Sequence, residues 1–266
     1  MARTMRVFVT GASSGIGEAL AREYARRGPG LAIGLVARRA EPLAALAAAL
    51  APAEAVPYAL DVTDRAALAA AAADFIARFG PPDVVVANAG VNGPTLTGTP
   101  GDEANFVRIL ATNVVAAYDT FAPFVPAMRA RGRGALVGIA SVAGVRGMPS
   151  LGGYCASKAA LIAYLESLRL ELRASGLRVV TIAPGYIRTP MTAANRYPMP
   201  FLMDVDAFAR RAVDAIGRGR SFAVIPWQMA WVARVLRVLP DALFDAAFAR
   251  APHKPRAGPA PPAPRG

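Results

Sequence analysis

The chain has 266 residues, 55% of them hydrophobic, which is enough to bury the core of one large domain. It contains one cysteine, Cys155, and one histidine, His253, so its composition excludes an internal disulfide and a metal site built from clustered cysteines. Catalysis by histidine or by histidine-bound zinc is disfavoured for the same reason, and we predict no metal site. The formal net charge is +12, but the arginines are scattered along the chain, so we do not expect nucleic-acid binding.

Short apolar runs alternate with Ala-rich stretches of helical character along most of the sequence. This alternation predicts βαβ units around a parallel sheet, and near-continuous apolar strands predict burial on both faces. We expect a helix from Thr63 or Asp64, either of which can cap it, to Phe79. The fold class is therefore α/β: a Rossmann-type, doubly wound parallel sheet of about seven strands, flanked by helices on both faces in a single domain. The expected strands are residues 5–10, 31–37, 55–60, 83–88, 134–140, 177–183 and 221–226.

The sequence beyond residue 226 has a different character. Residues 229–240 predict a short amphipathic helix, interrupted by Arg234 and Arg237 and too short to cross a bilayer. We expect the extension 227–250 to pack on the domain or on a subunit partner, with contact to a membrane surface as the less favoured alternative. Residues 251–266 are rich in Pro, Ala and Gly and predict a flexible tail.

The location of the protein is predicted from what the sequence lacks. The N-terminal residues lead directly into the first expected strand rather than into a signal-peptide pattern. No stretch reaches the roughly 18 uninterrupted apolar residues of a membrane span. We therefore expect a cytoplasmic protein.

The first expected strand ends in the segment TGASSGIG, residues 10–17, which opens a helix. Gly11 permits a tight turn, Gly15 lets backbone N–H groups approach a pyrophosphate at the helix N-terminus, and Gly17 allows close packing of helix on strand. The segment therefore predicts a site for a dinucleotide.

The end of the second strand indicates which dinucleotide binds. An acidic residue there would bond to a ribose 2′-hydroxyl, whereas arginine would pair with a 2′-phosphate. This chain has Arg38 and Arg39 at that point, so we predict a preference for NADP(H) over NAD(H). Exposed loop arginines without a ligand remain the alternative interpretation.

A tyrosine and a lysine that lie four residues apart are the strongest chemical signal. In a helix, Tyr154 and Lys158 share one face, and Lys158 is one of only two lysines in the chain. We expect the ammonium, together with the positive ring of an oxidised nicotinamide, to favour the phenolate of Tyr154. Ser141 follows a strand at the carboxyl edge of the sheet, where its hydroxyl can bond to a substrate oxygen.

These motifs together resemble the short-chain dehydrogenase/reductase family, in its shorter single-domain branch. The resemblance covers roughly residues 5–226 and rests on TGASSGIG, on Asn-Ala-Gly at 88–90, and on Ser141, Tyr154 and Lys158 in family order. It implies that Asn113 helps a proton relay through Lys158, and that Lys158 bonds the nicotinamide ribose. The implied catalytic set is Asn113, Ser141, Tyr154 and Lys158. The residues predicted to hold the cofactor, partly from this resemblance, are Gly11, Ser13, Ser14, Gly15, Ile16, Gly17, Arg38, Arg39, Asp61, Val62, Asn88, Ala89, Gly90, Tyr154, Lys158, Pro184, Gly185, Ile187 and Thr189.

The resemblance also predicts a substrate lid and an assembly. Residues 190–206 fall where the family has its variable lid, and they are rich in Met, Pro and aromatic residues, which favours a hydrophobic substrate. The family's assembly implies a homodimer or homotetramer through apolar helix faces around 106–128 and 154–172, although core packing explains those faces equally well.

The leading hypothesis is an NADP(H)-dependent oxidoreductase that moves hydride between nicotinamide and a carbonyl or secondary alcohol, with Tyr154 as general acid or base. A reductase of 3-oxoacyl groups on a carrier protein would share every motif and could dock an acidic carrier on the basic surface. A non-catalytic protein that senses dinucleotides is the third alternative, and the intact Tyr/Lys pair disfavours it.

Overall fold

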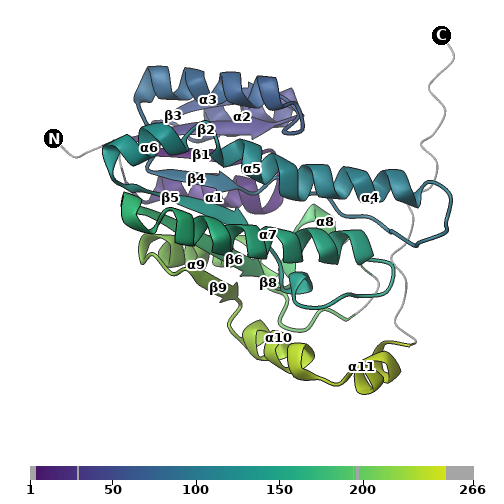
Figure 1. The fold of residues 1–266 in the computed structure, drawn as a ribbon. Helices are drawn as coiled ribbons and strands as arrows, with labels where there is room; N and C mark the ends of the chain where they lie inside the picture. The colour runs from purple at the N-terminus through teal and green to yellow at the C-terminus, as the bar shows by residue number, and fades with distance from the viewer. Residues whose placement is uncertain (1–3, 29, 194, 196–197, 250–266) are drawn as a thin grey trace, which may run out of the picture.

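The computed structural model describes residues 4–28, 30–193, 195 and 198–249, so the predicted tail 251–266 lies outside the described residues. Its centre is a seven-stranded parallel sheet in the order β3-β2-β1-β4-β5-β6-β9 (Figure 1). This confirms the predicted Rossmann-type α/β fold. The strands are β1 Met5–Thr10, β2 Leu31–Ala37, β3 Glu54–Ala59, β4 Val84–Ala87, β5 Gly134–Ile139, β6 Leu177–Pro184 and β9 Phe222–Ile225.

The strands formed where the sequence is continuously apolar, because the central strands are covered on both sides. Every residue of β2 and of β4 is buried. The edge strand β3 instead has no buried residue, and three of its six residues are exposed, since only part of it is covered. Seven predicted strands were found in order, and no end differs from the prediction by more than one residue.

Helices cover both faces of the sheet (Figure 1). One face packs against α1, α2 and α9 around a core that includes Leu20, Leu43 and Phe208. The other packs against α3, α5, α6 and α7 around Phe8, Phe75 and Leu165. The helices are α1 Gly15–Arg26, α2 Ala40–Ala49, α3 Arg65–Phe79, α4 Asp102–Leu110, α5 Ala116–Phe121, α6 Val125–Arg131, α7 Gly152–Glu171, α8 Pro190–Ala193 and α9 Val205–Gly217, with short turns η1 Ala111–Val115, η2 Val142–Gly144 and η3 Arg173–Ser175.

The start of α3 illustrates how local sequence sets the boundaries. Asp64 caps the helix, because its side chain accepts a hydrogen bond of 3.0 Å from the backbone N–H of Ala67. Gly80 follows the last residue with φ of +80°, a conformation that favours glycine. Of the two caps considered from the sequence, Asp64 is therefore the one used.

The C-terminal extension contains two helices instead of the single one predicted over 229–240. These are α10, Gln228–Val238, and α11, Asp241–Phe248. The chain turns at Pro240, which cannot continue a helix. Met229 and Ala233 of α10 are buried, whereas Trp227 and Trp231 are exposed. Within the described ranges, no helix combines the length and apolarity needed to cross a membrane.

A small two-stranded sheet joins the two ends of the predicted lid region. It pairs β7, Ile187–Arg188, with β8, Met203–Asp204, and Arg188 bonds to Asp204 at 2.9 Å. Strands of two residues have no detectable period, so the sequence did not predict them. They hold the residues just before the predicted lid beside residues near its end.

Candidate active site

A cleft of about 490 Å³ lies at the carboxyl ends of the strands. It lies at β1 and β4, from which the chain continues to strands on opposite sides of the sheet. Gly17 and Asn113 are the two predicted site residues that do not line it. The predicted residues that do are Gly11, Ser13, Ser14, Gly15, Ile16, Arg38, Arg39, Asp61, Val62, Asn88, Ala89, Gly90, Ser141, Tyr154, Lys158, Pro184, Gly185, Ile187 and Thr189.

In the glycine loop, residues 10–17, backbone atoms lie in close contact with the backbone of Ala89 and with each other. Gly11 has φ of +69°, and a Cβ there would lie 2.8 Å from Cα of Ala89. A Cβ on Gly17 would lie 2.2 Å from the carbonyl oxygen of Gly11, so this glycine packs α1 on the loop, as predicted, without facing the cleft. The loop therefore presents the N-terminus of α1 to the cleft at close range.

Two polar side chains hold the ends of β1 and β4 together beneath the loop. Asn88 donates a hydrogen bond of 2.9 Å to the carbonyl of Thr10 and one of 3.3 Å to that of Gly11. The Thr10 hydroxyl accepts from the backbone N–H groups of Asn88 and Ala89 at 3.1 and 3.2 Å. Asn88 thus links the strands, and Thr10 is a buried partner that sequence reasoning missed.

The two arginines after β2 lie at one end of the cleft. Arg39 donates to the carbonyl and the hydroxyl of Ser13, at 3.1 and 3.2 Å. Arg38 lies 3.7 Å from a carboxylate oxygen of Asp61, and both side chains are largely exposed. A hydrogen bond from the Thr63 N–H lowers the pKa of Asp61, and Arg38 acts in the same direction. This end of the cleft is therefore cationic and solvent-accessible.

The other end of the cleft brings together Ser141, Tyr154 and Lys158. Tyr154 and Lys158 share one face of α7, with the lysine ammonium 5.8 Å from the centre of the tyrosine ring. Nζ of Lys158 donates a 2.8 Å hydrogen bond to the carbonyl of Ile139, the last residue of β5. Ser141 follows that strand and accepts from the N–H of Ala143 at 3.1 Å. The chain thus places a hydroxyl, a phenol and an ammonium together.

Burial acts on the ionisable groups of Tyr154 and Lys158 in opposite directions. Burial raises the pKa of Tyr154, and the hydrogen bond with Ser141 lowers it by less. Burial also lowers the pKa of Lys158, to about 8. Among the protein's own groups, the ammonium does not offset the desolvation of the phenol. The expectation that the ammonium and an oxidised nicotinamide together favour the phenolate stays a prediction.

Asn113 lies behind this trio, in a π-helical turn between α4 and α5. Its side chain accepts from the N–H of Val91 at 2.8 Å and donates to the Val91 carbonyl at 3.0 Å and to the Ser157 hydroxyl at 2.9 Å. Ser157 in turn donates to the carbonyl of Tyr154 at 2.7 Å. Asn113 therefore connects the cleft wall after β4 to α7, and Ser157 is a second buried residue that the sequence analysis missed.

The segment after β6 closes the cleft on a third side. Thr192 donates to the carbonyl of Ile187 at 2.6 Å and accepts from the N–H of Thr189 at 3.0 Å, which stabilises the turn into the predicted lid. Met191 and Thr192 themselves line the cleft. Of the predicted lid, residues 194, 196 and 197 lie outside the described residues.

The lining residues that were not predicted include two polar side chains from one helical segment. Arg108 and Thr112 line the cleft from α4 and η1. Their spacing of four places them on one helical face, but the sequence does not say which face of that helix is turned to the cleft. The packing of α4 against α7 determines which face of α4 is turned to the cleft.

The cleft fits a nicotinamide dinucleotide. A Cβ on Gly15, which has φ of +58°, would lie 3.4 Å from Thr189 across the cleft, so a side chain would narrow it. A Cβ on Gly90 would lie 3.3 Å from Asn113 and 3.6 Å from the ammonium of Lys158. Small residues thus keep space between the helix N-terminus, which suits a pyrophosphate, and the Tyr154 side, which suits the nicotinamide.

Comparison with known proteins agrees with this site. The family model for the short chain dehydrogenases matches residues 5–199. An uncharacterized oxidoreductase of Myxococcus xanthus is 42% identical over 245 residues, which are 91% of this chain and 95% of that protein.

Two solved structures share the fold. A short-chain dehydrogenase/reductase from Burkholderia phymatum in complex with NAD has a TM-score of 0.79 at 23% identity, over 96% of this chain and 98% of its own. An alcohol dehydrogenase from Thermococcus sibiricus complexed with 5-hydroxy-NADP has a TM-score of 0.74 at 27% identity, over 84% and 96%.

The matched region contains the glycine loop and Ser141, Tyr154 and Lys158, all of which line one cleft. These features and the similarities agree on the family and on a nicotinamide cofactor. The chain belongs to the short-chain dehydrogenase/reductase family and is an NAD(P)-dependent oxidoreductase.

Proposed function

We propose that the protein uses NADP(H) to interconvert a carbonyl compound and a secondary alcohol of hydrophobic character, with Tyr154 as general acid or base. The observation that carries the proposal is one cleft that has arginines at one end and the Ser141, Tyr154 and Lys158 side chains at the other.

The bound nicotinamide would supply or accept the hydride. During reduction, Tyr154 Oη donates its proton to the oxygen of the substrate as negative charge develops there. The Ser141 hydroxyl donates a hydrogen bond to the same oxygen and stabilises that charge. Lys158 holds the ribose through its N–H groups that do not bond to Ile139, and it returns a proton to Tyr154 by a relay that Asn113 supports. Oxidation follows the same steps in reverse.

The preference for NADP(H) rests on Arg38 and Arg39. Both lie at the end of β2, where a 2′-phosphate would pair with them bidentately, and the described part of that loop has no acidic residue to repel it. The nearest carboxylate, Asp61, follows β3 and is already partnered by Arg38 and Thr63. The site thus retains a net positive charge toward a phosphate.

The cleft wall beside Tyr154 supports a hydrophobic substrate. Ile187 and Met191 line the cleft, and Met191 is 42% exposed. A 3-oxoacyl group on a carrier protein remains the alternative substrate, because the surface is basic. Turnover of a β-keto thioester but not of simple ketones would favour that alternative.

The proposal also covers the cellular location and the oligomeric state of the enzyme. We place it in the cytoplasm as a homodimer or homotetramer, with no nucleic-acid partner and no required membrane contact through residues 229–240. Exposed apolar side chains on α4, α5 and α7 support the assembly.

The test is a panel of aldehydes, ketones, steroids and β-keto thioesters, with consumption of NADPH measured by absorbance. Tyr154→Phe removes the phenolic proton and should reduce turnover of any active compound about a thousandfold, while NADPH binding stays nearly unchanged. Tyr164→Phe is the matched control, because it removes a phenol from the same helix outside the cleft.

Two results would contradict the proposal. Equal activity of Tyr154→Phe and the wild type would refute the role of Tyr154. Tight NADPH binding without turnover of any compound in the panel would instead favour the dinucleotide-sensing alternative.

A further inference from the structure

The loop between β5 and α7, residues 140–151, carries Ser141 and leads to Tyr154. Its first part, η2, packs directly on α7 at the catalytic lysine. A Cβ on Gly144 would lie 2.8 Å from the carbonyl carbon of Lys158 and 3.0 Å from the backbone nitrogen of Ala159. There is no space for either element to move toward the other, so the position of η2 and the position of Lys158 are coupled.

The opposite side of the loop is bound to the C-terminal extension by Arg146, whose side chain is only 17% exposed. Nη1 of Arg146 donates to the carbonyl of Leu236 at 2.8 Å and also to the carbonyl of Leu239. Nη2 pairs with the carboxylate of Asp241. The guanidinium lies 4.0 Å from the centre of the Phe244 ring.

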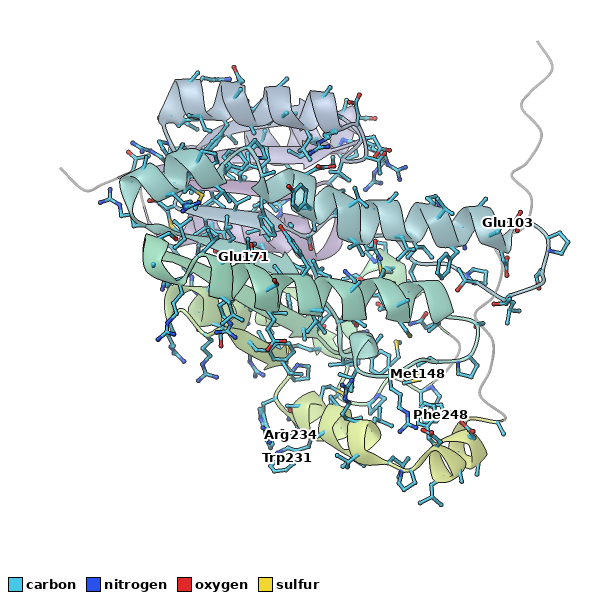
Figure 2. All side chains as sticks on the ribbon, viewed as in Figure 1. Glu103, Met148, Glu171, Trp231, Arg234 and Phe248 are labelled. Atoms are coloured by element: carbon cyan, nitrogen blue, oxygen red, sulfur yellow. The ribbon has the colours of Figure 1, made fainter. Side chains whose placement is uncertain are left out.

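A second arginine reinforces this contact from the other direction. Arg237 of α10 donates to the carbonyl of Val145 at 3.3 Å. In Figure 2 the loop that carries Met148 lies between α7 and the pair α10 and α11, while Trp231 and Arg234 project from the outer side of α10. The loop is therefore held on both sides by different parts of the chain.

The chemistry of this contact suits arginine and no other residue. The last carbonyls of α10 have no partner within their own helix, and a cation is favourable at a helix C-terminus. Asp241 lies in the first turn of α11, where a carboxylate is favourable. One planar guanidinium with five donors satisfies both helix ends and stacks on Phe244, whereas a lysine could make only part of these bonds.

We infer that Arg146 is a positioning residue: it joins α10 and α11 to the loop 140–151 and so fixes Ser141 relative to Tyr154 and Lys158. This inference rests on the proposed function for its catalytic consequence. Helices α10 and α11 begin after residue 199, where the match to the family model ends. The extension thereby acts on the reaction without contributing a group that touches the reacting atoms.

The test compares Arg146→Met, which keeps the length but removes every donor, with Arg146→Lys, which restores the charge and some of the bonds. Asp241→Asn is a milder variant that keeps Arg146, and because the Asp241 side chain is 93% exposed its replacement does not disturb the core. Arg234→Met is the matched control, since Arg234 stacks on the exposed Trp231 and lies on the outer side of the same helix.

The first readout is hydrogen–deuterium exchange of the loop, which needs no substrate. Arg146→Met should raise exchange in residues 142–151 and leave β1 and β4 unchanged, and Asp241→Asn should raise it less. Unchanged exchange in the loop of Arg146→Met would overturn the inference, whether or not the protein proves to be a carbonyl reductase.

The second readout is steady-state kinetics with the best ketone or aldehyde from the panel. We expect kcat to fall about tenfold in Arg146→Met, because small misplacements of catalytic groups reduce rates steeply. The Kd for NADPH should stay within about twofold and Arg146→Lys should recover part of kcat, which general loss of structure would not produce. An unchanged kcat in a variant whose loop exchanges faster would show that the loop does not position Ser141, and would also overturn the inference.

Discussion

Burial acts on Tyr154 and Lys158 in opposite senses, and this determines how the enzyme should respond to pH. The pKa of Tyr154 is raised, so the phenol keeps its proton at neutral pH. The pKa of Lys158 is lowered to about 8, so the ammonium begins to lose its charge just above neutrality. A phenol that holds its proton is ready to act as an acid, which suits reduction rather than oxidation.

The two directions of the reaction should therefore differ in pH dependence. In the proposed mechanism reduction needs protonated Tyr154, so its rate should be nearly flat from about pH 6 to pH 7 and fall above that range as Lys158, whose pKa is about 8, loses its proton. Oxidation needs the phenolate, so its rate should rise by up to about tenfold per pH unit over the same range. Initial rates of NADPH consumption and NADP⁺ reduction, measured with one ketone and its alcohol, would show this contrast.

A decrease in reduction between pH 6 and pH 7, with oxidation already at its plateau, would contradict the prediction. It would mean that bound cofactor lowers the pKa of Tyr154 enough to outweigh burial. The Tyr164→Phe variant again serves as control, because its profile should match that of the wild type.

Arg38 gives the second prediction for a single residue. Arg38→Ala removes a charge-assisted partner of a 2′-phosphate, so NADPH affinity should fall about tenfold to a hundredfold while NADH affinity changes little. Fluorescence titration with both cofactors measures this difference. Arg129→Ala, at an exposed position of α6 away from the cleft, is the control. Equal affinity of the wild type for NADPH and NADH would refute the cofactor preference.

Sequence spacing predicted which residues meet in the cleft better than it predicted their properties. Tyr154 and Lys158 lie one helical turn apart, and helix geometry alone brings them together. Their pKa directions depend on burial by many distant residues, which no local motif encodes. Arg146 was missed for a related reason: its partners Leu236 and Asp241 lie 90 and 95 residues away in the chain.

The packing of α1 on the glycine loop permits a direct test of one element. In Gly17→Ala the new Cβ would meet the Gly11 carbonyl at 2.2 Å and Asn88 Nδ2 at 2.6 Å, so helix and loop must separate. We expect a loss of about 3 kcal/mol in the free energy of unfolding, with weaker dinucleotide binding. Urea unfolding and NADPH titration measure the two effects.

Gly217→Ala is the matched control for this change. Gly217 ends α9, and a Cβ there would meet nothing within 4 Å. The substitution should therefore be neutral or stabilise the protein by up to about 1 kcal/mol. A Gly17→Ala variant as stable as the wild type would show that α1 can shift on the loop without cost.

The elements that were predicted well are those whose sequence pattern is typical of only one kind of secondary structure. Buried parallel strands are continuous apolar runs, so all seven were located. The π-helical turn at Ala111–Val115 was not predicted, because its sequence differs in no evident way from an α-helix and its form depends on Asn113 bonding across to Val91. The short strands β7 and β8 and the break between α10 and α11 were missed because each spans only a few residues.

The position of the cleft is a property of the whole sheet, and the βαβ pattern was sufficient to predict it. Since the strand order reverses between β1 and β4, the loops that follow these two strands lead to opposite sides of the sheet and leave a crevice between them. The loops after β2, β3, β5 and β6 then supply the remaining walls. Sequence alone could not give the assembly, since a helix face in a core and one in a subunit interface have the same pattern.

The distribution of exposed apolar side chains argues for the proposed assembly of the whole molecule. Val107, Val115 and Tyr118 on α4, η1 and α5 are 65%, 55% and 49% exposed, and Leu170 on α7 is 60% exposed. These helices pack on one another, so the exposed groups belong to one side of the molecule. A stable dimer needs about 800 Å² of such surface from each partner, and covering these side chains would contribute to it.

Light scattering coupled to size-exclusion chromatography should therefore give a mass two or four times that of the chain. Val115→Asp places two carboxylates in or near a two-fold contact and should shift the protein toward the monomer, because an unpaired buried charge is costly. Val235→Asp is the matched control, since Val235 is 56% exposed on α10, away from these helices. A monomeric wild type would contradict the assembly, and dissociation by Val235→Asp alone would place the interface on α10 instead.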